Sequence, residues 1–169
     1  MIISLIGYMG SGKSHISKLL TQKLQFKLID LDKEISLKNK LSISEIFEKK
    51  GEIYFRKQER LMLEDVLATR ENSVLSLGGG TPAYYDNMEF INTHSQSVFL
   101  RTSVKTLAER LLKQKQKRPL IAAQTDEGLP EFIAKHLFER NYYYSKAKFT
   151  VDTDGKDPAD IADEIAALF

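Results

Sequence analysis

Short apolar runs, separated by longer stretches of mixed character, set the pattern of this chain. We expect β-strands at five of these runs: Ile2–Ile6, Phe26–Ile29, Val74–Leu77, Val98–Leu100 and Phe149–Val151. Several of the runs are apolar at nearly every position, which is typical of parallel strands that helices cover on both faces.

The stretches between the strands repeat apolar residues with the period of an amphipathic helix. Two such faces are Ile16, Leu19, Leu20 and Leu24, and then Val104, Leu107, Ala108 and Leu111. Strands that alternate with helices in this way predict a three-layer α/β domain, with a five-stranded parallel sheet and helices on both of its faces.

Local signals mark where several helices begin and end. Ser42 followed by Glu45 forms a capping-box pattern ahead of an apolar pair, and Gly51 is a plausible stop for that helix. Pro130 and Pro158 both suit the first turn of a helix.

Length and composition limit the classes of protein to consider. The chain has 169 residues, which suits one domain spanning 1–169, and it has no cysteine for a disulfide or a thiolate metal site. The N-terminal apolar run is too short for a signal sequence, and no run approaches the ~18 apolar residues of a membrane helix. We therefore expect a cytoplasmic protein that does not enter a membrane.

Charge gives no sign of a nucleic-acid partner. The net charge is only +2, and the lysines are scattered among acidic residues rather than concentrated. The densest basic stretch, Lys113–Arg118, is read either as a solvated helix end or as a loop that faces an anion.

The stretch Gly7–Ser14, GYMGSGKS, fits the phosphate-binding loop pattern G-x-x-x-x-G-K-[ST] and directly follows the first strand. Its glycines let successive backbone N–H groups point inward, and the helix that begins near Lys13 adds the positive end of its dipole. Lys13 can reach the β- and γ-phosphates, and Ser14 can ligate Mg²⁺. The motif therefore predicts a nucleoside-triphosphate site.

Two carboxylates follow the second strand, where ligands of parallel sheets bind. Asp30 and Asp32 flank Leu31, and alternation along an extended chain would place both on one side. One could hold Mg²⁺ through water while the other accepts a proton from a substrate hydroxyl. The alternative is that Asp32 merely caps a helix starting near Lys33.

A possible anion-binding arginine comes next. Arg56 and Glu59 lie three apart on a predicted helix, so Glu59 can hold the guanidinium for two parallel bonds to a carboxylate. Taken alone, an ordinary surface ion pair explains this spacing as well.

The third strand ends in the glycines Gly78, Gly79 and Gly80, with Ser76 as the only polar side chain of the predicted strand. Three successive glycines suggest that a ligand lies directly against the backbone. Arg118 and Arg140 stand on later segments, where an arginine could close over a transferring phosphate or remain an ordinary surface residue.

Together the motifs GYMGSGKS, DLD, FRKQE, SLGGG and RPL strongly resemble the shikimate kinase family, whose fold is that of the nucleoside-monophosphate-kinase-like P-loop proteins. The motifs occur in the family's order and span nearly the whole chain. The resemblance implies transfer of the γ-phosphate of ATP to the 3-hydroxyl of shikimate, in the pathway to chorismate and the aromatic amino acids. It also implies a monomer with a substrate-binding subregion over about 31–61 and a mobile lid over about 112–128.

The resemblance also assigns roles by motif position. Asp32 would bind the substrate hydroxyls and accept the proton, Arg56 and Arg140 would hold the carboxylate, and Gly78, Gly79 and Gly80 would lie along the ring. The nucleotide would contact a set of residues made up of Gly10, Ser11, Gly12, Lys13, Ser14, His15 and Arg118. Lys13 and Arg118 would stabilise the transferring group, while Ser14, with Asp30 and Ser76 through water, would organise Mg²⁺.

The motif spacing departs from that of the family in the last third of the chain. Tyr144 keeps the family spacing after Arg140, but Ala147 comes one residue early, which we interpret as a one-residue deletion. Arg110, Lys113 and Lys115 are equal candidates for the residue that stacks on adenine, and the turn 153–158 is expected over the base or simply as a polar turn. The tyrosines at 142–144 are expected to pack the helix, and the three histidines are too dispersed for a metal site.

Two other functions compete with this interpretation. One is another small-molecule kinase of the same fold, acting on gluconate or a nucleoside monophosphate, which the glycine triplet and the two aspartates disfavour. The other is a nucleotide-dependent switch that binds ATP without phosphorylating an acceptor.

Overall fold

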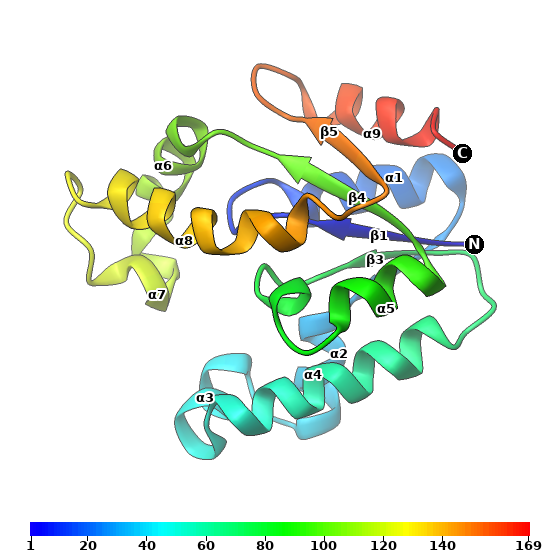
Figure 1. Ribbon diagram of the computed structural model, residues 1–169, viewed down its shortest axis with the longest axis horizontal. Coiled ribbons are helices and arrows are strands. Elements are labelled where there is room, and N and C mark those ends of the chain that lie inside the picture. Colours follow the sequence, from blue (N-terminus) through cyan, green and yellow to red (C-terminus); the bar gives the residue numbers. More distant parts are fainter.

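The computed structural model describes residues 1–169, apart from the side chains of Lys117 and Pro119. Its centre is a five-stranded sheet in the order β2-β3-β1-β4-β5, in which every pair of neighbouring strands is parallel (Figure 1). The strands are β1 Ile2–Ile6, β2 Lys27–Asp30, β3 Ser73–Ser76, β4 Gln96–Arg101 and β5 Phe149–Asp152. The predicted parallel sheet is confirmed.

β1 has the predicted bounds, and the other four strands differ from the predicted ones by one or two residues. β2 begins at Lys27 because the N–H of Phe26 still bonds to the carbonyl of Thr21 at the end of the preceding helix. β3 begins at Ser73, whose N–H bonds to the carbonyl of Met1, and its pairing with β2 ends at Ser76 opposite Asp30. Ser73 therefore joins Ser76 as a second polar residue of this strand.

Nine α-helices and two short 3₁₀ turns connect and flank the strands within the described chain. Their bounds are α1 Lys13–Leu24, α2 Leu31–Asn39, α3 Ile43–Lys50, α4 Glu52–Leu67, η1 Thr81–Ala83, α5 Asn87–His94, α6 Val104–Leu112, η2 Lys115–Lys117, α7 Pro119–Ala122, α8 Leu129–Tyr144 and α9 Pro158–Ala166. Over the part of the chain described here, no helix is long and apolar enough to cross a membrane.

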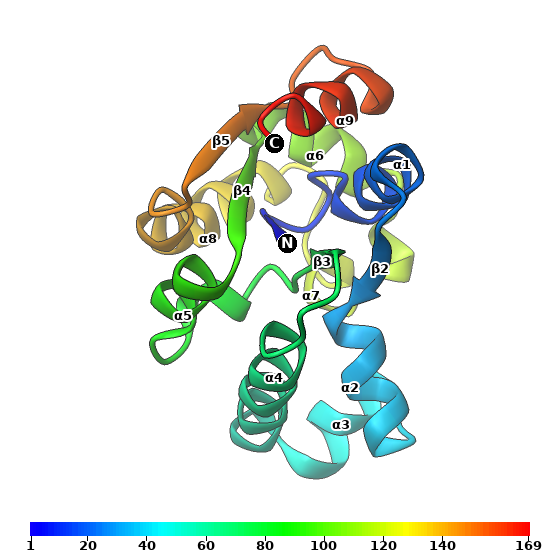
Figure 2. The same ribbon diagram turned by 90° about the vertical axis from the view of Figure 1, so that its right-hand side faces the viewer.

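Figure 2 shows α1 and α9 on one side of the sheet and α5 and α8 on the other. Alternation along β1 divides its side chains between two cores, with Ile3 and Leu5 packed among residues of α1 and α9. Ile2 and Ile6 belong to the second and larger core, which includes Met88 of α5 and Leu137 of α8. This arrangement confirms the predicted three layers.

Helices α2, α3 and α4 pack against one another beside the β2 edge of the sheet (Figures 1 and 2). They cover the stretch predicted as the substrate-binding subregion. The stretch predicted as a lid comprises the end of α6, η2, α7 and the turn into α8, and it lies beyond the carboxyl ends of the strands.

Ser42 begins α3 with the predicted capping box. Its hydroxyl accepts from the N–H of Glu45 at 3.2 Å, and the Glu45 carboxylate accepts from the N–H of Ser42 at 2.8 Å. Replacing Ser42 by alanine removes one of the two bonds, so Ser42→Ala should lower the free energy of unfolding by about 1 kcal/mol, measured by urea denaturation.

The matched control is Ser145→Ala at the end of α8, where the hydroxyl bonds only to the Tyr142 carbonyl of its own helix. This change should leave the free energy of unfolding within about 0.5 kcal/mol of the wild type. Equal effects of the two variants would contradict the capping role of Ser42.

Candidate active site

The loop Gly7–Ser14 connects β1 to α1 at the carboxyl edge of the sheet. Gly10 and Gly12 have φ values of 83° and 95°, in the left-handed region where a side chain is disfavoured, and Gly12 is the N-terminal cap of α1. The Lys13 ammonium donates to the carbonyls of Gly7 at 2.6 Å and Tyr8 at 3.0 Å. The loop is therefore folded around its own lysine, as a phosphate-binding loop requires.

Burial lowers the pKa of Lys13 to about 7, an effect opposed by Asp32 and Asp30 and strengthened by Arg118 and Arg140. The positive charge of Lys13 therefore lacks full compensation from the protein. A polyanion bound in the loop would supply the compensating charge and raise the pKa of Lys13 again.

A cavity of about 630 Å³ opens beside this loop. All of the predicted nucleotide and metal residues line it, namely Gly10, Ser11, Gly12, Lys13, Ser14, His15, Asp30, Ser76 and Arg118. Asp32, Gly78 and Gly79 line the same cavity, so the structure brings the predicted donor side and acceptor side together.

Asp30 caps α2, because its Oδ1 accepts from the N–H of Lys33 at 3.2 Å. The alternative in which Asp32 caps this helix is therefore wrong. The argument from strand alternation is also wrong, since the helix already begins at Leu31. Asp32 reaches the cavity from the first turn of α2 instead, and both carboxylates line it.

The Asp32 carboxyl group has a pKa raised to about 6. Burial is the main cause, and the nearby carboxylates of Glu59 and Asp30 add to it, while Lys13 and Arg56 oppose it. A carboxylate with this pKa is a better proton acceptor than an ordinary aspartate and is still ionised at neutral pH.

The triplet Gly78–Gly80 follows β3, and each glycine leaves space for a different side chain. A Cβ atom at Gly78 would lie 3.2 Å from Asp32 Oδ1, and one at Gly80 would lie 3.0 Å from both terminal nitrogens of Arg56. At Gly79 it would lie 3.2 Å from Arg140 Nη1. The three predicted acceptor side chains therefore converge on this turn.

Arg56 and Glu59 form the predicted pair, with Nη1 donating to Oε1 at 3.1 Å. Glu59 is only 1% exposed, and its other oxygen accepts from the hydroxyl of Thr81 at 2.7 Å. The alternative of an ordinary surface ion pair is therefore wrong, because Glu59 is fixed on both sides and Arg56 is held against the triplet.

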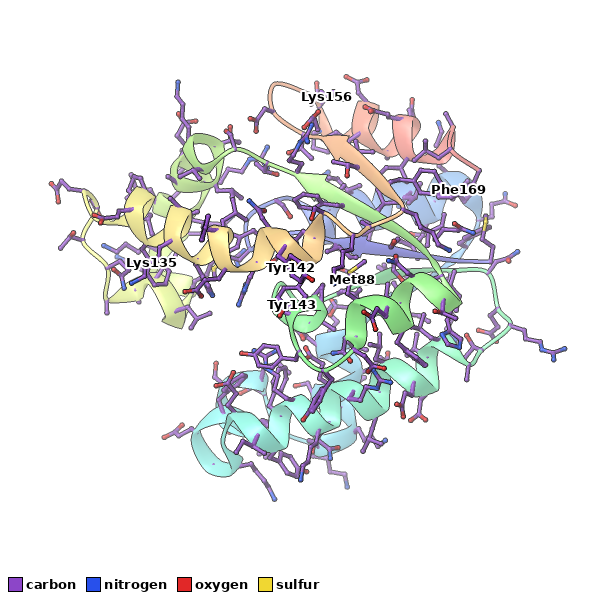
Figure 3. All side chains as sticks on the ribbon, in the orientation of Figure 1. Met88, Lys135, Tyr142, Tyr143, Lys156 and Phe169 are labelled. Carbon is purple, nitrogen blue, oxygen red and sulfur yellow. The ribbon has the colours of Figure 1, made fainter. Side chains whose placement is uncertain are left out.

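Arg140 and Tyr144 lie one turn apart on α8, and both face Gly79 in the middle of the triplet. The buried Tyr144 hydroxyl donates to the carbonyl of Gly79 at 2.5 Å, and burial raises its pKa to about 12, which keeps it a donor. Of the three tyrosines, Tyr144 packs as expected, whereas Tyr142 is 65% exposed (Figure 3). The spacing change at Ala147 falls after this contact and leaves Arg140 beside Gly79.

Sequence reasoning missed a link between the loop and α8. Tyr8, 1% exposed, has its hydroxyl 2.9 Å from Nδ1 of His136, and the Arg140 guanidinium carbon lies 5.7 Å from the centroid of the Tyr8 ring. Only the helical spacing of His136 and Arg140, four residues apart, could have hinted at this contact.

Basic groups surround the remaining part of the cavity. Arg110 donates to the carbonyl of Gly10 at 3.1 Å, and both Arg110 and Lys113 line the cavity. Lys115 instead pairs with Asp126 at 2.9 Å and is not among the lining residues. Lys156, from the turn between β5 and α9, also lines the cavity (Figure 3).

The Arg118 guanidinium donates to Oε1 of Gln114 from Nε at 3.3 Å and from Nη2 at 3.1 Å. Both side chains line the cavity, and burial lowers the pKa of Arg118 from its usual high value. The predicted lid arginine thus faces the phosphate-binding loop across the cavity.

Comparison with known proteins shows the family of this chain. A sequence model of the shikimate kinase family matches residues 9–169. Shikimate kinase of Flavobacterium psychrophilum is 44% identical over 164 residues, which cover 96% of this chain and 95% of the relative. That of Flavobacterium johnsoniae is 47% identical over 155 residues, covering 91% and 90%. The chain belongs to the shikimate kinase family.

Solved structures agree with this membership. The crystal structure of shikimate kinase from Bacteroides thetaiotaomicron has a TM-score of 0.93 at 37% identity, covering 99% of this chain and 97% of the other. Shikimate kinase from Acinetobacter baumannii in complex with shikimate has a TM-score of 0.87 at 32% identity, covering 99% and 91%. The chain thus has the P-loop kinase fold of the shikimate kinase family and is an ATP-dependent kinase.

The raised pKa of Asp32 has a consequence for stability in this shikimate kinase family member. Because its pKa is higher in the folded protein than the ordinary aspartate value of 3.8, the folded state loses stability as pH rises from about 4 to about 6. Asp32→Asn should remove this cost and raise the free energy of unfolding at pH 8 by roughly 1–3 kcal/mol. The gain should disappear towards pH 4.

Urea denaturation across this pH range measures the effect, with Asp65→Asn as the control. Asp65 is exposed and forms only a 3.5 Å surface pair with Lys38, so its loss should change stability by less than about 0.5 kcal/mol. A loss of stability in Asp32→Asn at pH 8 would contradict the raised pKa.

Proposed function

We propose that this chain transfers the γ-phosphate of ATP to the 3-hydroxyl of shikimate, giving shikimate 3-phosphate and ADP. The observation that carries this proposal is the convergence of Asp32, Arg56 and Arg140 on the triplet Gly78–Gly80, directly beside the phosphate-binding loop. A small acid with several hydroxyl groups needs positively charged side chains that bind its carboxylate, and a protein carboxylate beside the hydroxyl that reacts. This turn offers both.

Arg56 and Arg140 bind the substrate carboxylate in this proposal, from their places beside Gly80 and Gly79. Glu59 fixes Arg56, so the guanidinium is pre-organised rather than flexible, and little side-chain entropy is lost on binding. Gly78, Gly79 and Gly80 let the substrate ring lie against the backbone. Asp32 accepts the hydroxyl proton as the oxygen attacks phosphorus, a role that suits its raised pKa.

The donor phosphates lie in the loop Gly10–His15, where backbone N–H groups and the amino end of α1 face them. Lys13 stabilises the negative charge of the transferring group, for which it must leave the carbonyls of Gly7 and Tyr8. Arg118 approaches from the segment between α6 and α8, over about 112–128, which we propose acts as a lid that excludes water and so prevents ATP hydrolysis.

We propose that Mg²⁺ accompanies ATP and is held by Ser14, with Asp30 and Ser76 acting through water. These oxygen-bearing side chains line the cavity and suit a hard cation. Among the described residues there is no group of three or more His, Cys, Asp or Glu side chains able to cage a metal, which fits an ion that takes most of its ligands from phosphates and water. When bound, the ion offsets phosphate charge.

We further propose a cytoplasmic monomer, as the family resemblance implies.

The direct test is ADP release from Mg-ATP by purified protein with shikimate, quinate, gluconate or a nucleoside monophosphate as acceptor. We expect the strongest stimulation by shikimate, because it combines a carboxylate for the arginines with a ring hydroxyl for Asp32. Stimulation by another acceptor would keep the donor site and refute the proposed substrate. ATP binding without stimulation by any acceptor would favour a nucleotide-dependent switch.

Binding of the substrate carboxylate by Arg56 is tested by Arg56→Lys, which retains the charge beside the buried Glu59 but loses the planar pair of donors. The KM for shikimate should rise about tenfold or more, corresponding to about 1.4 kcal/mol, while the KM for ATP stays within twofold. Arg70→Lys, at an exposed position in the loop between α4 and β3, serves as the control. An unchanged KM for shikimate in Arg56→Lys would remove Arg56 from the substrate site.

A further inference from the structure

The Arg56 guanidinium is covered by an aromatic side chain from a segment that none of the motifs includes. Tyr84 follows η1, and its ring centroid lies 3.8 Å from Cζ of Arg56, closer than the rings of Phe55 at 5.0 Å and Phe47 at 6.0 Å. At this distance the guanidinium stacks on the ring, which fixes its orientation as well as its position.

The hydroxyl of Tyr84 is directed to a carboxylate that also faces Arg56. It donates to Oε1 of Glu52 at 2.7 Å, and the same oxygen lies 3.5 Å from Nε of Arg56. Nε is buried and has no hydrogen-bond partner among the described residues. The tyrosine hydroxyl and the Nε of Arg56 therefore face the same carboxylate oxygen, and the hydroxyl has the shorter contact.

The backbone around Tyr84 is strained in a way that its contacts explain. Tyr85 has a φ of 50°, a left-handed conformation that is uncommon outside glycine, although its side chain is 59% exposed. On one side of it Tyr84 stacks on Arg56, and on the other Asp86 pairs with Arg60 at 2.6 Å. Two arginines one turn apart on α4 are thus held by the residues on either side of the strained position.

We propose that Tyr84 is a positioning residue for the substrate carboxylate, an inference that rests on the proposed function of this site. Its ring keeps the Arg56 guanidinium in one plane. Its hydroxyl holds Glu52 away from a full ion pair with Nε, so that an internal carboxylate does not occupy the arginine in place of the substrate. Tyr84 acts through Arg56 and does not itself touch the reacting atoms.

The test compares Tyr84→Phe with Tyr85→Phe, which removes the same hydroxyl group from the neighbouring exposed residue. In Tyr84→Phe the released Glu52 should pair with Arg56 and raise the KM for shikimate about three- to tenfold. The KM for ATP and kcat should stay within twofold. Tyr85→Phe should leave all three values within twofold of the wild type.

Rescue separates this mechanism from a general disturbance of the site. The double variant Tyr84→Phe, Glu52→Gln should return the KM for shikimate to within twofold of the wild type, because the amide carries no charge to attract Arg56. Tyr84→Leu removes the stacking ring as well, so its KM should remain raised when Glu52→Gln is added. Thermal unfolding of each variant establishes that it is folded at the assay temperature.

The outcomes distinguish this inference from the proposed function. No wild-type turnover with shikimate would refute the proposed function and the role of Tyr84 with it. Normal wild-type turnover with an unchanged KM in Tyr84→Phe would refute the role of Tyr84 alone. A raised KM that Glu52→Gln fails to restore would likewise contradict the competition between Glu52 and the substrate.

Discussion

The site depends on a close approach of side chains to the glycine turn after β3. Asp32 from α2, Arg56 from α4 and Arg140 from α8 each occupy space at the position where Gly78, Gly80 or Gly79 would otherwise carry a side chain. A Cβ atom at Gly79 would also lie 3.5 Å from the carbonyl oxygen of Gly7 and 3.6 Å from the backbone nitrogen of Met9. One turn thus joins the acceptor groups to the phosphate-binding loop. The parallel sheet makes this possible, because β1 and β3 are neighbours and end at the same edge.

Charge at this turn is arranged for ligands rather than for the stability of the free protein. Burial favours the neutral forms of both Lys13 and Asp32. It lowers the pKa of Lys13 to about 7 and raises the pKa of Asp32 to about 6. An anionic phosphate donor would compensate the positive charge of Lys13. The carboxylate of a bound acid would compensate the positive charges of the arginines near Asp32. Glu59 is the exception, since Arg56 and Thr81 satisfy it within the protein. The Arg56–Glu59 pair makes the site rigid. Lys13 and Asp32, whose charges the protein does not fully compensate, are available for binding and reaction.

Most of the fold could be predicted from the sequence because its signals are local. The apolar runs mark all five strands, and the capping box at Ser42 and the glycines of the phosphate-binding loop lie where the structure has them. That Asp30 rather than Asp32 caps α2 could not be predicted, since it depends on α2 starting immediately at the strand end. The hydrogen bond from Thr81 to Glu59, which lies 22 residues earlier, is a tertiary contact without a local signal. The contacts of Tyr8 with His136 and of Tyr84 with Arg56 were missed for the same reason.

The most direct test of this account is shikimate binding to Gly80→Ala, measured by titration calorimetry beside binding of a non-hydrolysable ATP analogue. A Cβ atom at Gly80 would lie 3.0 Å from both terminal nitrogens of Arg56, so the guanidinium must shift by a few tenths of an ångström away from the turn. We predict that shikimate affinity falls at least about tenfold while the affinity for the ATP analogue changes less than twofold. Unchanged shikimate affinity would contradict the central claim that the glycine turn organises the acceptor site.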